Sequence, residues 1–283
     1  MLGLNGAQNN RIAPERDYGN FIMSFRRRVS HALGDRGLPL RLLALKHIAH
    51  ALIPGYRLKY PQLDWWSNEP FNQYLDRFDE RKGHNTDRRW IIHQLLRLTT
   101  NVPGDTAECG VFAGAGSYLI LRANERDNLH KRTHYMFDSF EGLSQPDTAD
   151  GSYWQAGDMA MAEDAVRHNL RDCSNYVAMK GWIPSRFAEV AGRRFSFVHI
   201  DVDLYEPTRD SLAFFLPRMT AGGIIVVDDY GFATCPGATQ AVDDILRHGP
   251  EKMLAMPDGG GFLIKGQATA DGAQLDSSTH YQK

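Results

Sequence analysis

The chain has 283 residues, of which 42% are hydrophobic and 23% are charged, and its formal net charge at pH 7 is −2. This length and composition suffice to bury a large core, and the near-neutral charge gives no general attraction to nucleic acid. The cysteines, Cys109, Cys173 and Cys235, form no CxxC pair, so neither a disulfide framework nor a structural zinc site is indicated. The start of the chain is polar and lacks the apolar core of a signal peptide, so we expect a cytoplasmic protein.

The first helical pattern lies at residues 38–53, LPLRLLALKHIAHALI, where apolar residues recur at helical spacing. Basic residues interrupt this segment: Arg41, Lys46, His47 and His50. It is therefore too short and too charged to span a membrane, and we expect no stable membrane insertion. We expect its Leu and Ile face to pack on the rest of the chain or on a second subunit, which would form a homo-oligomer through the N-terminal helices. Attachment to a membrane surface is the alternative, because residues 26–28 are arginines.

From residue 87 onward, helical patterns alternate with short apolar strands, which is typical of a doubly wound α/β sheet. The predicted strands are a segment ending at Glu108 and residues 134–137, 176–179, 195–200 and 223–227. The predicted helices are residues 87–98, 159–169, 210–219 and 239–247. The sequence PDGGG between residues 252–256 and 261–265 predicts a closing antiparallel hairpin. We expect a helical N-terminal extension over residues 1–86, a main domain over 87–265 and a disordered tail over 266–283.

A glycine-rich motif, TAECGVFAGAGS, at residues 106–117 joins the first predicted strand to a helix. Gly110, Gly114 and Gly116 let the backbone turn tightly and approach a ligand, and the helix that follows directs its N–H groups toward that ligand. The spacing fits neither a phosphate loop nor a dinucleotide fingerprint. Glu108 in front of the turn would repel a pyrophosphate but suits a cationic ligand such as S-adenosylmethionine. A plain strand-turn-helix packing role is the alternative.

The residues that follow the predicted strands matter because ligands of such sheets bind at the carboxyl ends of the strands. Asp138 follows the second strand, where a carboxylate can accept hydrogen bonds from both ribose hydroxyls of a nucleotide. A helix cap is the alternative for Asp138. Phe140 and Trp182 are candidates to enclose an adenine ring, although an aromatic residue near a strand end is more often part of the core.

A second group of polar residues comes from the motifs HIDVDLYEPT and VVDDYG at the ends of the fourth and fifth predicted strands. Crowded carboxylates are costly unless a cation neutralises them or one holds a proton, and oxygen-only ligands favour Mg²⁺. We therefore predict a metal site at Asp201, Asp228 and Asp229. The alternative is that Asp203 and Asp229 cap the elements that follow. His199 shares a strand face with Asp201, and a hydrogen-bonded core histidine is the simpler interpretation for it.

Five motifs in order, VPGDTAECGVFAGAGS, FDSFEGL, HIDVDLYEPT, GGIIVVDDYG and ATQAVDDIL, resemble the macrocin O-methyltransferase-like (TylF) family of class I S-adenosylmethionine-dependent methyltransferases. The resemblance covers residues 87–265 and implies a Rossmann-like, mostly parallel seven-stranded sheet with an antiparallel C-terminal hairpin. It implies S-adenosylmethionine and Mg²⁺ as cofactors, and a sugar hydroxyl of a glycoside, nucleotide sugar or polysaccharide precursor as acceptor. The family commonly has Asp-Gly-Asp-Leu-Tyr-Glu-Ser where this chain reads DVDLYEP, so both acids and the tyrosine are kept.

The resemblance implies cofactor contacts at Glu108, Gly110 and Asp138, and metal contacts at the three aspartates named above. The full set of candidate cofactor-binding residues is Glu108, Gly110, Phe112, Gly114, Ser117, Asp138, Ser139, Phe140, Gly181, Trp182 and Asp201. Asp201 is the first candidate for the base that takes the hydroxyl proton, with Asp203 and His199 as alternates. We expect residues 144–161, with Tyr153 and Trp154, to fold over the cleft as a lid, and a long loop without such a role is the alternative.

Two other functions remain open from the sequence. A phenol or catechol acceptor would suit the same fold, cofactor and metal, because adjacent oxygens bind a metal equally well. A non-catalytic module that binds the cofactor and assembles with partners through its N-terminal helix is the third hypothesis. The intact group of rim aspartates argues against this third hypothesis, because such a module has no need of them.

Overall fold

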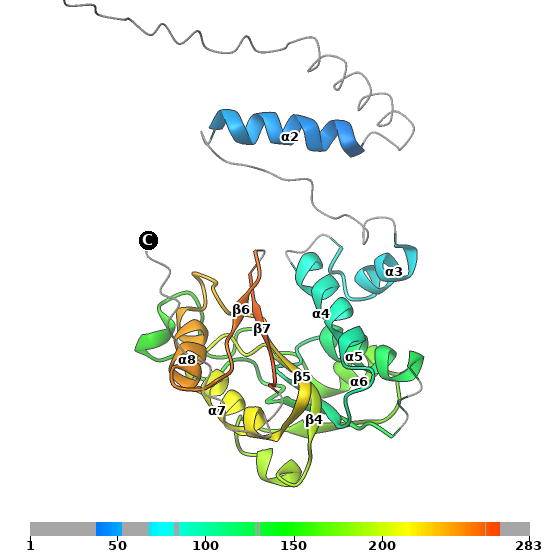
Figure 1. The fold of residues 1–283 in the computed structure, drawn as a ribbon, viewed down its shortest axis with the longest axis vertical. Coiled ribbons are helices and arrows are strands. Elements are labelled where there is room, and N and C mark those ends of the chain that lie inside the picture. Colours follow the sequence, from blue (N-terminus) through cyan, green and yellow to red (C-terminus); the bar gives the residue numbers. More distant parts are fainter. Residues whose placement is uncertain are drawn as a thin grey trace, which may run out of the picture. The chain divides into compact units, whose positions relative to one another are not determined.

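The structure is a computed structural model that describes residues 38–52, 68–81, 85–127, 129, 131–257 and 259–266 (Figure 1). The chain divides into two compact units, Met1–Asp64 and Trp65–Lys283. In the first unit, α2 (Leu38–Leu52) confirms the predicted helix. The arginines at residues 26–28 and the predicted disordered tail beyond residue 266 lie outside the described residues. Within the described part of the chain, every helix is too short or too polar to cross a membrane.

A seven-stranded sheet forms the centre of the second unit, with the order β3-β2-β1-β4-β5-β7-β6. The first five strands along the chain are parallel, and β7 runs antiparallel to both β5 and β6. The strands are β1 (Asp105–Cys109), β2 (His134–Asp138), β3 (Tyr176–Lys180), β4 (Phe195–Ile200), β5 (Met219–Val227), β6 (Leu254–Ala255) and β7 (Gly261–Ile264). The predicted doubly wound sheet and its antiparallel hairpin are confirmed.

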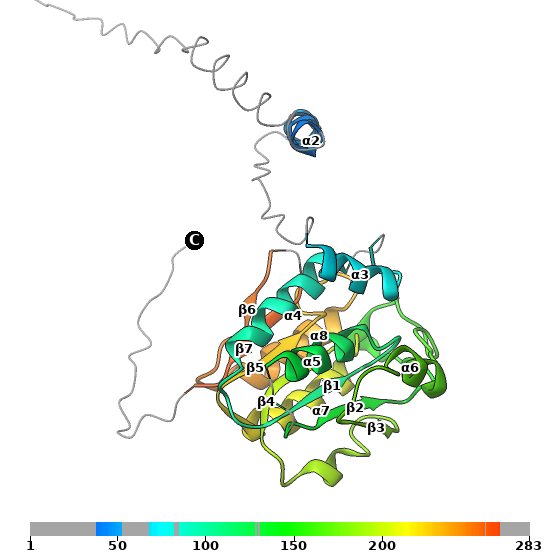
Figure 2. The ribbon, with the colours of Figure 1, turned by 90° about the vertical axis from the view of Figure 1, so that its right-hand side faces the viewer.

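Helices cover both faces of this sheet (Figures 1 and 2). They are α3 (Glu69–Arg77), α4 (Thr86–Leu98), α5 (Ala115–Arg126), α6 (Glu163–Asn169), α7 (Tyr205–Phe215) and α8 (Pro236–Leu246), with the 3₁₀ turns η2 (Thr148–Asp150), η3 (Phe187–Val190) and η4 (Leu216–Arg218). The predicted start of α6 at residue 159 is wrong, because Met159 has a φ of 60° and interrupts a right-handed helix. α7 starts earlier than predicted, at Tyr205, and ends before residue 219, which already belongs to β5.

Alternation along the strands sorts the core into two layers, because successive side chains point to opposite faces of a sheet. Phe197 of β4 packs with Leu95 of α4 and Ile120 of α5 on one face. Val198, the next residue, packs with Leu212 of α7 on the other face. Each such fully buried side chain stabilises the fold by about 1.5–3 kcal/mol relative to an exposed one.

The second unit begins before the predicted domain boundary at residue 86. Phe71 and Leu75 of α3 are buried in the same core layer as α4 and α5. The hydroxyl of Tyr74 also donates a hydrogen bond to the carbonyl of Ala115, at 3.2 Å. α3 thus buries its apolar face within the second unit, which starts at Trp65 and not at the predicted residue 87.

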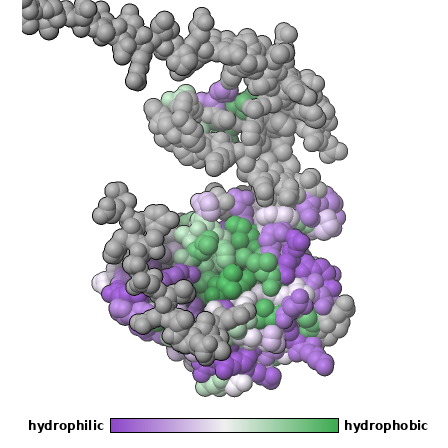
Figure 3. All heavy atoms as spheres, viewed as in Figure 1, coloured by the Kyte–Doolittle hydropathy of each residue, from purple (hydrophilic) through white to green (hydrophobic). Residues whose placement is uncertain are grey.

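An apolar surface lies over β6 and β7 in the view of Figure 3. Leu254 of β6 and Ile264 of β7 are exposed over half or more of their area, at 57% and 50%. β6 is also the edge strand of the sheet.

The expected homo-oligomer through the N-terminal helices stays a prediction.

The strand order reverses between β1 and β4, and backbone hydrogen bonds join the carboxyl ends of β1, β4 and β5. The amide of Asp201 donates to the carbonyl of Cys109 at 2.8 Å, and the amide of Asp228 donates to the carbonyl of Ile200 at 2.9 Å. In open α/β sheets, ligands bind outside the carboxyl ends of the strands at such a reversal. The fold therefore brings the predicted acidic residues to the position expected for a ligand site.

Candidate functional site

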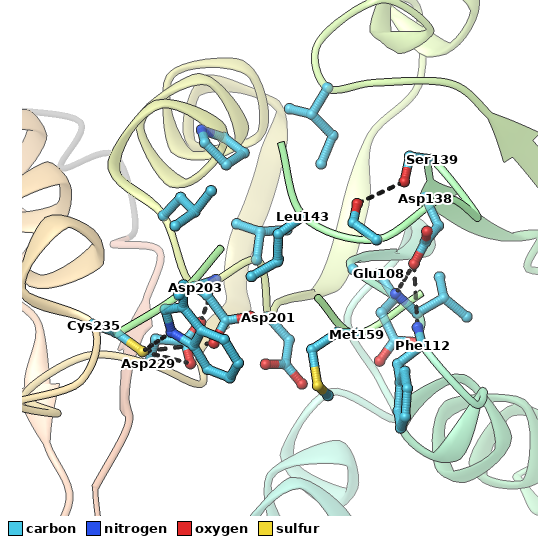
Figure 4. Close-up of a pocket in the computed structure, with 18 of the residues that line it drawn as sticks. Glu108, Phe112, Asp138, Ser139, Leu143, Met159, Asp201, Asp203, Asp229 and Cys235 are labelled. Carbon is cyan, nitrogen blue, oxygen red and sulfur yellow. Dashed lines mark hydrogen bonds between the residues drawn. The ribbon is translucent and has the colours of Figure 1, made fainter. Parts of the chain in front are cut away.

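A cavity of about 630 Å³ lies at the carboxyl ends of the parallel strands (Figure 4). Most of the candidate residues line it: Glu108, Gly110, Phe112, Asp138, Ser139, Trp182, Asp201, Asp203 and Asp229. The remaining candidates do not line it: Gly114, Ser117, Phe140, Gly181, His199 and Asp228. Figure 4 shows Glu108 and Asp138 at one end of the cavity, Asp203 and Asp229 at the other, and Asp201 between them.

Asp138 holds the glycine-rich loop in place. Its Oδ2 accepts hydrogen bonds from the amides of Val111, at 2.7 Å, and Phe112, at 3.1 Å. Its Oδ1 accepts one from the amide of Phe140, at 2.6 Å. Since a carboxylate oxygen offers about two acceptor positions, Oδ1 retains one for a ligand in the cavity. Asp138 is thus a structural acceptor as well as a candidate ligand contact.

The aromatic pair at the cavity differs from the predicted pair. Trp182 lines the cavity and is 45% exposed, as expected. Phe140 instead has a φ of 56° and its side chain is buried with Met136 and Val166 in the core, away from the cavity wall. Phe112, 40% exposed, takes its place on the cavity wall.

Glu108 lines the cavity, but its carboxylate is bonded to groups beneath the glycine-rich loop. Ser117 donates to Oε2, and Oε1 lies 2.7 Å from Nδ1 of His199. Gly116 makes room for this carboxylate, because a β-carbon there would lie 2.0 Å from Oε1. Ser117 is fully buried in this network, and its contact with the cofactor stays a prediction.

His199 connects this network to the acidic end of the cavity. It is fully buried, and its Nε2 lies 3.4 Å from Oδ1 of Asp228. Burial lowers the pKa of His199, but hydrogen bonds to Asp228 and Glu108 outweigh burial and raise the pKa to about 10. An imidazole that donates from both nitrogens has no free lone pair, so these contacts favour Asp201 and Asp203 over His199 as the base. The simpler interpretation as a hydrogen-bonded core histidine holds.

Two arginines of α4, which the sequence reasoning missed, neutralise part of the acidic group. Arg88 forms an ion pair with Asp228 and lies over the ring of Phe232, with its Cζ 4.9 Å from the centroid. Nη1 of Arg89 lies 3.6 Å from Asp201, and Glu80 binds the opposite side of the same guanidinium. Figure 4 shows the Asp201 carboxylate pointing into the cavity, so its pairing with Arg89 leaves it accessible.

Basic residues neutralise the carboxylates of Asp201, Asp203 and Asp229 less than that of Asp228. Burial and Asp228 raise the pKa of Asp201 to about 6, and burial and Asp201 raise that of Asp203 to about 7. Burial and Asp203 also raise the pKa of Asp229 well above its ordinary value. For Asp228, by contrast, His199 and Arg88 outweigh burial and lower the pKa. Negative charge is therefore costly at the acidic end, and a divalent cation bound there would offset this cost.

Groups that could ligate a metal occur at two adjacent points of the described structure. In the first group, ligand atoms of His199, Asp201 and Asp228 lie within 4.8 Å of one another. In the second group, ligand atoms of Asp203, Asp229 and Cys235 do the same. The predicted ligands Asp201, Asp228 and Asp229 are thus near one another but divided between the two groups. Asp203 does not cap α7, because its amide donates to Asp229 and the amide of Tyr205 donates to Asp150 instead. The alternative of purely capping roles is not observed for Asp203.

The predicted lid contributes to the cavity wall through Ser144, Tyr153, Trp154 and Met159. Asp150 anchors this segment: it is 3% exposed, and its Oδ1 accepts the amide of Tyr205 at 2.7 Å. The segment thus lies against the first turn of α7, where the helix dipole favours a carboxylate.

Comparison with known proteins gives a consistent assignment. Residues 91–251 match the Macrocin-O-methyltransferase (TylF) family. The chain is 33% identical over 165 residues to demethyldecarbamoylnovobiocin O-methyltransferase of Streptomyces niveus, covering 52% of this chain and 60% of that protein. It is 31% identical over 189 residues to 8-demethyl-8-(2,3-dimethoxy-alpha-L-rhamnosyl)-tetracenomycin-C 4'-O-methyltransferase of Streptomyces olivaceus. This match covers 61% of this chain and 70% of that protein. The solved structure of the O-methyltransferase NovP matches with a TM-score of 0.53 and 28% identity, covering 64% of this chain and 81% of that one.

The chain spans 60% of the length of the Streptomyces niveus relative. The family match covers more than half of this chain, including β1, the glycine-rich loop, Asp138 and the acidic residues after β4 and β5. The chain belongs to the macrocin O-methyltransferase (TylF) family.

Proposed function

We propose that this protein is an S-adenosylmethionine-dependent O-methyltransferase that methylates a sugar hydroxyl of a glycoside, a nucleotide sugar or a polysaccharide precursor. The observation that carries the proposal is one cavity that joins the glycine-rich loop and Asp138 to Asp201, Asp203 and Asp229. Membership of the TylF family supports O-methylation. The name of the Streptomyces olivaceus relative includes a rhamnosyl group, which supports a sugar acceptor.

The cofactor would occupy the end of the cavity formed by the glycine-rich loop. Asp138 would accept a hydrogen bond from a ribose hydroxyl through the free position on Oδ1. The exposed faces of Phe112 and Trp182 offer apolar surface for the adenine ring. Since S-adenosylmethionine carries no phosphate, the absence of a phosphate-loop sequence in residues 106–117 agrees with this ligand.

Methyl transfer forms a bond between the acceptor oxygen and the methyl carbon and breaks the bond between that carbon and the sulfonium sulfur. The products are a methyl ether and S-adenosylhomocysteine, and the hydroxyl proton goes to a carboxylate. Asp201 and Asp203 both reach the cavity and have raised pKa values, so either can take this proton. General-base help of this kind contributes roughly 10²–10⁴-fold.

Mg²⁺ fits the donor set, because the acidic end offers several carboxylates whose pKa values are raised by burial and by one another's charge. Asp201, Asp228 and Asp229 would hold it. When bound, the ion supplies positive charge that stabilises the negative charge developing on the acceptor oxygen.

Calorimetric titration of S-adenosylhomocysteine into the full chain and into Asp138→Ala tests the cofactor. We expect micromolar binding to the wild type and at least a tenfold loss in the variant, and a folded wild type that does not bind would contradict the proposal. Methyl transfer to sugar and catechol panels, with and without EDTA, then tests the acceptor and the metal. Transfer to catechols alone would exclude a sugar acceptor, and full activity in EDTA would exclude the metal.

A further inference from the structure

Three side chains from distant parts of the sequence meet at the acidic end of the cavity. The indole Nε1 of Trp154 lies 3.3 Å from the Sγ of Cys235, to which it donates. The thiol of Cys235 in turn donates to Oδ1 of Asp203, at 3.5 Å. Trp154 belongs to the segment over the cavity, Cys235 precedes α8 and Asp203 follows β4. The contacts therefore connect that segment to a carboxylate that can take the acceptor proton.

The backbone fixes both ends of this connection. Cys235 is the N-cap residue of α8 and is 3% exposed, and its amide donates to the carbonyl of Phe232 at 3.1 Å. The amide of Asp203 donates to Oδ2 of Asp229 at 2.9 Å. With its backbone held in this way, the Asp203 carboxylate is oriented by its hydrogen bond from Cys235.

The position of Trp154 depends on the anchoring of its own segment. Asp150 is packed so closely on α8 that a β-carbon at Gly237 would lie 1.9 Å from its Oδ1. The same oxygen accepts the amide of Tyr205 at the start of α7. Trp154 belongs to the segment that these contacts of Asp150 hold against the two helices.

The chemistry of the thiol suits a donor. Cys235 is 3% exposed, and its thiol carries one hydrogen that it can donate. Because Trp154 donates to the sulfur, the thiol hydrogen is directed at the carboxylates, of which Oδ1 of Asp203, at 3.5 Å, is nearer than Oδ1 of Asp229, at 3.8 Å. A hydrogen bond from the thiol compensates the Asp203 carboxylate for water that it loses in the cavity.

We propose that Cys235 is a positioning residue. When Trp154 donates a hydrogen bond to its sulfur, Cys235 orients the carboxylate of Asp203. The inference rests on the proposed function, because it gives Asp203 a part in methyl transfer. It predicts that Trp154 and Cys235 act as one unit and that a hydroxyl can replace the thiol.

Kinetics of Cys235→Ala, Cys235→Ser, Trp154→Phe and the double variant Cys235→Ala/Trp154→Phe test the coupling. Each removal should lower kcat about tenfold while KM for S-adenosylmethionine changes less than about twofold. Cys235→Ser should retain most of kcat, because serine keeps both donor and acceptor, and the double variant should be no worse than either single one. Losses that multiply in the double variant, or a serine variant as slow as the alanine one, would overturn the proposal. Cys173→Ser, which changes a thiol away from the cavity, is the matched control.

A second readout does not need an acceptor. In the full chain, the rate at which iodoacetamide labels Cys235 is followed by peptide mapping, with the fully buried Cys109 as internal reference. Trp154→Ala should raise this rate at least about fivefold, because it uncovers the sulfur. An unchanged rate would overturn the contact between Trp154 and Cys235 even if the wild type methylates sugars. A raised rate in a protein that methylates nothing would contradict the proposed function but not this contact.

Discussion

Gly110 lies so close to Asp201 that a β-carbon on Gly110 would stand 1.8 Å from the carbonyl oxygen of Asp201. Gly110 follows β1 with a φ of 78°, a conformation that favours glycine. Asp201 follows β4, the neighbouring strand. The contact therefore ties the loop proposed to hold the cofactor to the first carboxylate of the acidic end, and a side chain at Gly110 would disturb both.

Gly110→Ala should destabilise the protein and abolish cofactor binding. The left-handed backbone and the overlap with Asp201 together should lower the free energy of unfolding by about 3 kcal/mol. Urea denaturation and S-adenosylhomocysteine calorimetry measure the two effects. Gly192→Ala is the matched control, because Gly192 is exposed and a β-carbon there meets no atom within 4 Å. A Gly110→Ala variant with wild-type stability and affinity would show that the contact is not present in solution.

Arg88→Met should be destabilising, because it removes one of the two cationic partners, Arg88 and His199, of the buried carboxylate of Asp228. The Asp228 side chain is 2% exposed and that of Arg88 15%. Breaking a buried pair of this kind costs about 3–5 kcal/mol. If Mg²⁺ binds beside Asp228, it should restore part of this loss, so the free energy of unfolding is measured in EDTA and in excess Mg²⁺.

The comparison for this variant is Arg122→Met, which removes an exposed ion pair with Glu125. Its effect should stay below about 1 kcal/mol and be independent of Mg²⁺. If Mg²⁺ stabilises wild type and Arg88→Met to the same extent, Asp228 is not among the metal ligands.

The fold and the edge that carries the site could be predicted because the relevant signals are local. Short apolar strands separated by helical patterns define a parallel sheet, and parallel strands present their carboxyl ends at one edge. Gly110, Asp138 and Asp201 each follow such a strand, and all three line one cavity. Asp203 and Asp229 were predicted at the same edge of the sheet because they also come after parallel strands.

What the sequence pattern missed depends on contacts between distant segments. Arg88 and Asp228 are 140 positions apart, and neither motif indicates the other. One local signal was available: Arg88 and Arg89 stand in the first turn of α4, where the helix dipole disfavours cations unless acids lie nearby. Phe140 was misplaced for a similar reason, because its positive φ, which turns it into the core, is not visible in its residue type.

His134 shows how the buried network fixes a protonation state. The hydroxyl of Ser117 donates to Glu108, so at 3.0 Å it accepts the N–H from Nε2 of His134. The hydroxyl of Thr106 accepts from Asn124 and lies 3.0 Å from Nδ1 of His134, to which it donates. Every partner is satisfied by the neutral imidazole, and burial lowers the pKa of His134 to about 4.

This lowered pKa predicts a loss of stability in mild acid. The unfolded chain takes up the proton near pH 6.5 and the folded chain only near pH 4, so the contribution is complete above pH 6.5 and is lost as the pH falls to 4. The loss over this window should be on the order of 3 kcal/mol. Urea denaturation at several pH values should show a flatter dependence for His134→Asn than for the wild type, whereas His168→Asn, at an exposed site on α6, should follow the wild type. If His134→Asn does not fold, NMR of the wild-type imidazole gives the same test, because a His134 that titrates near pH 6.5 would contradict the neutral network.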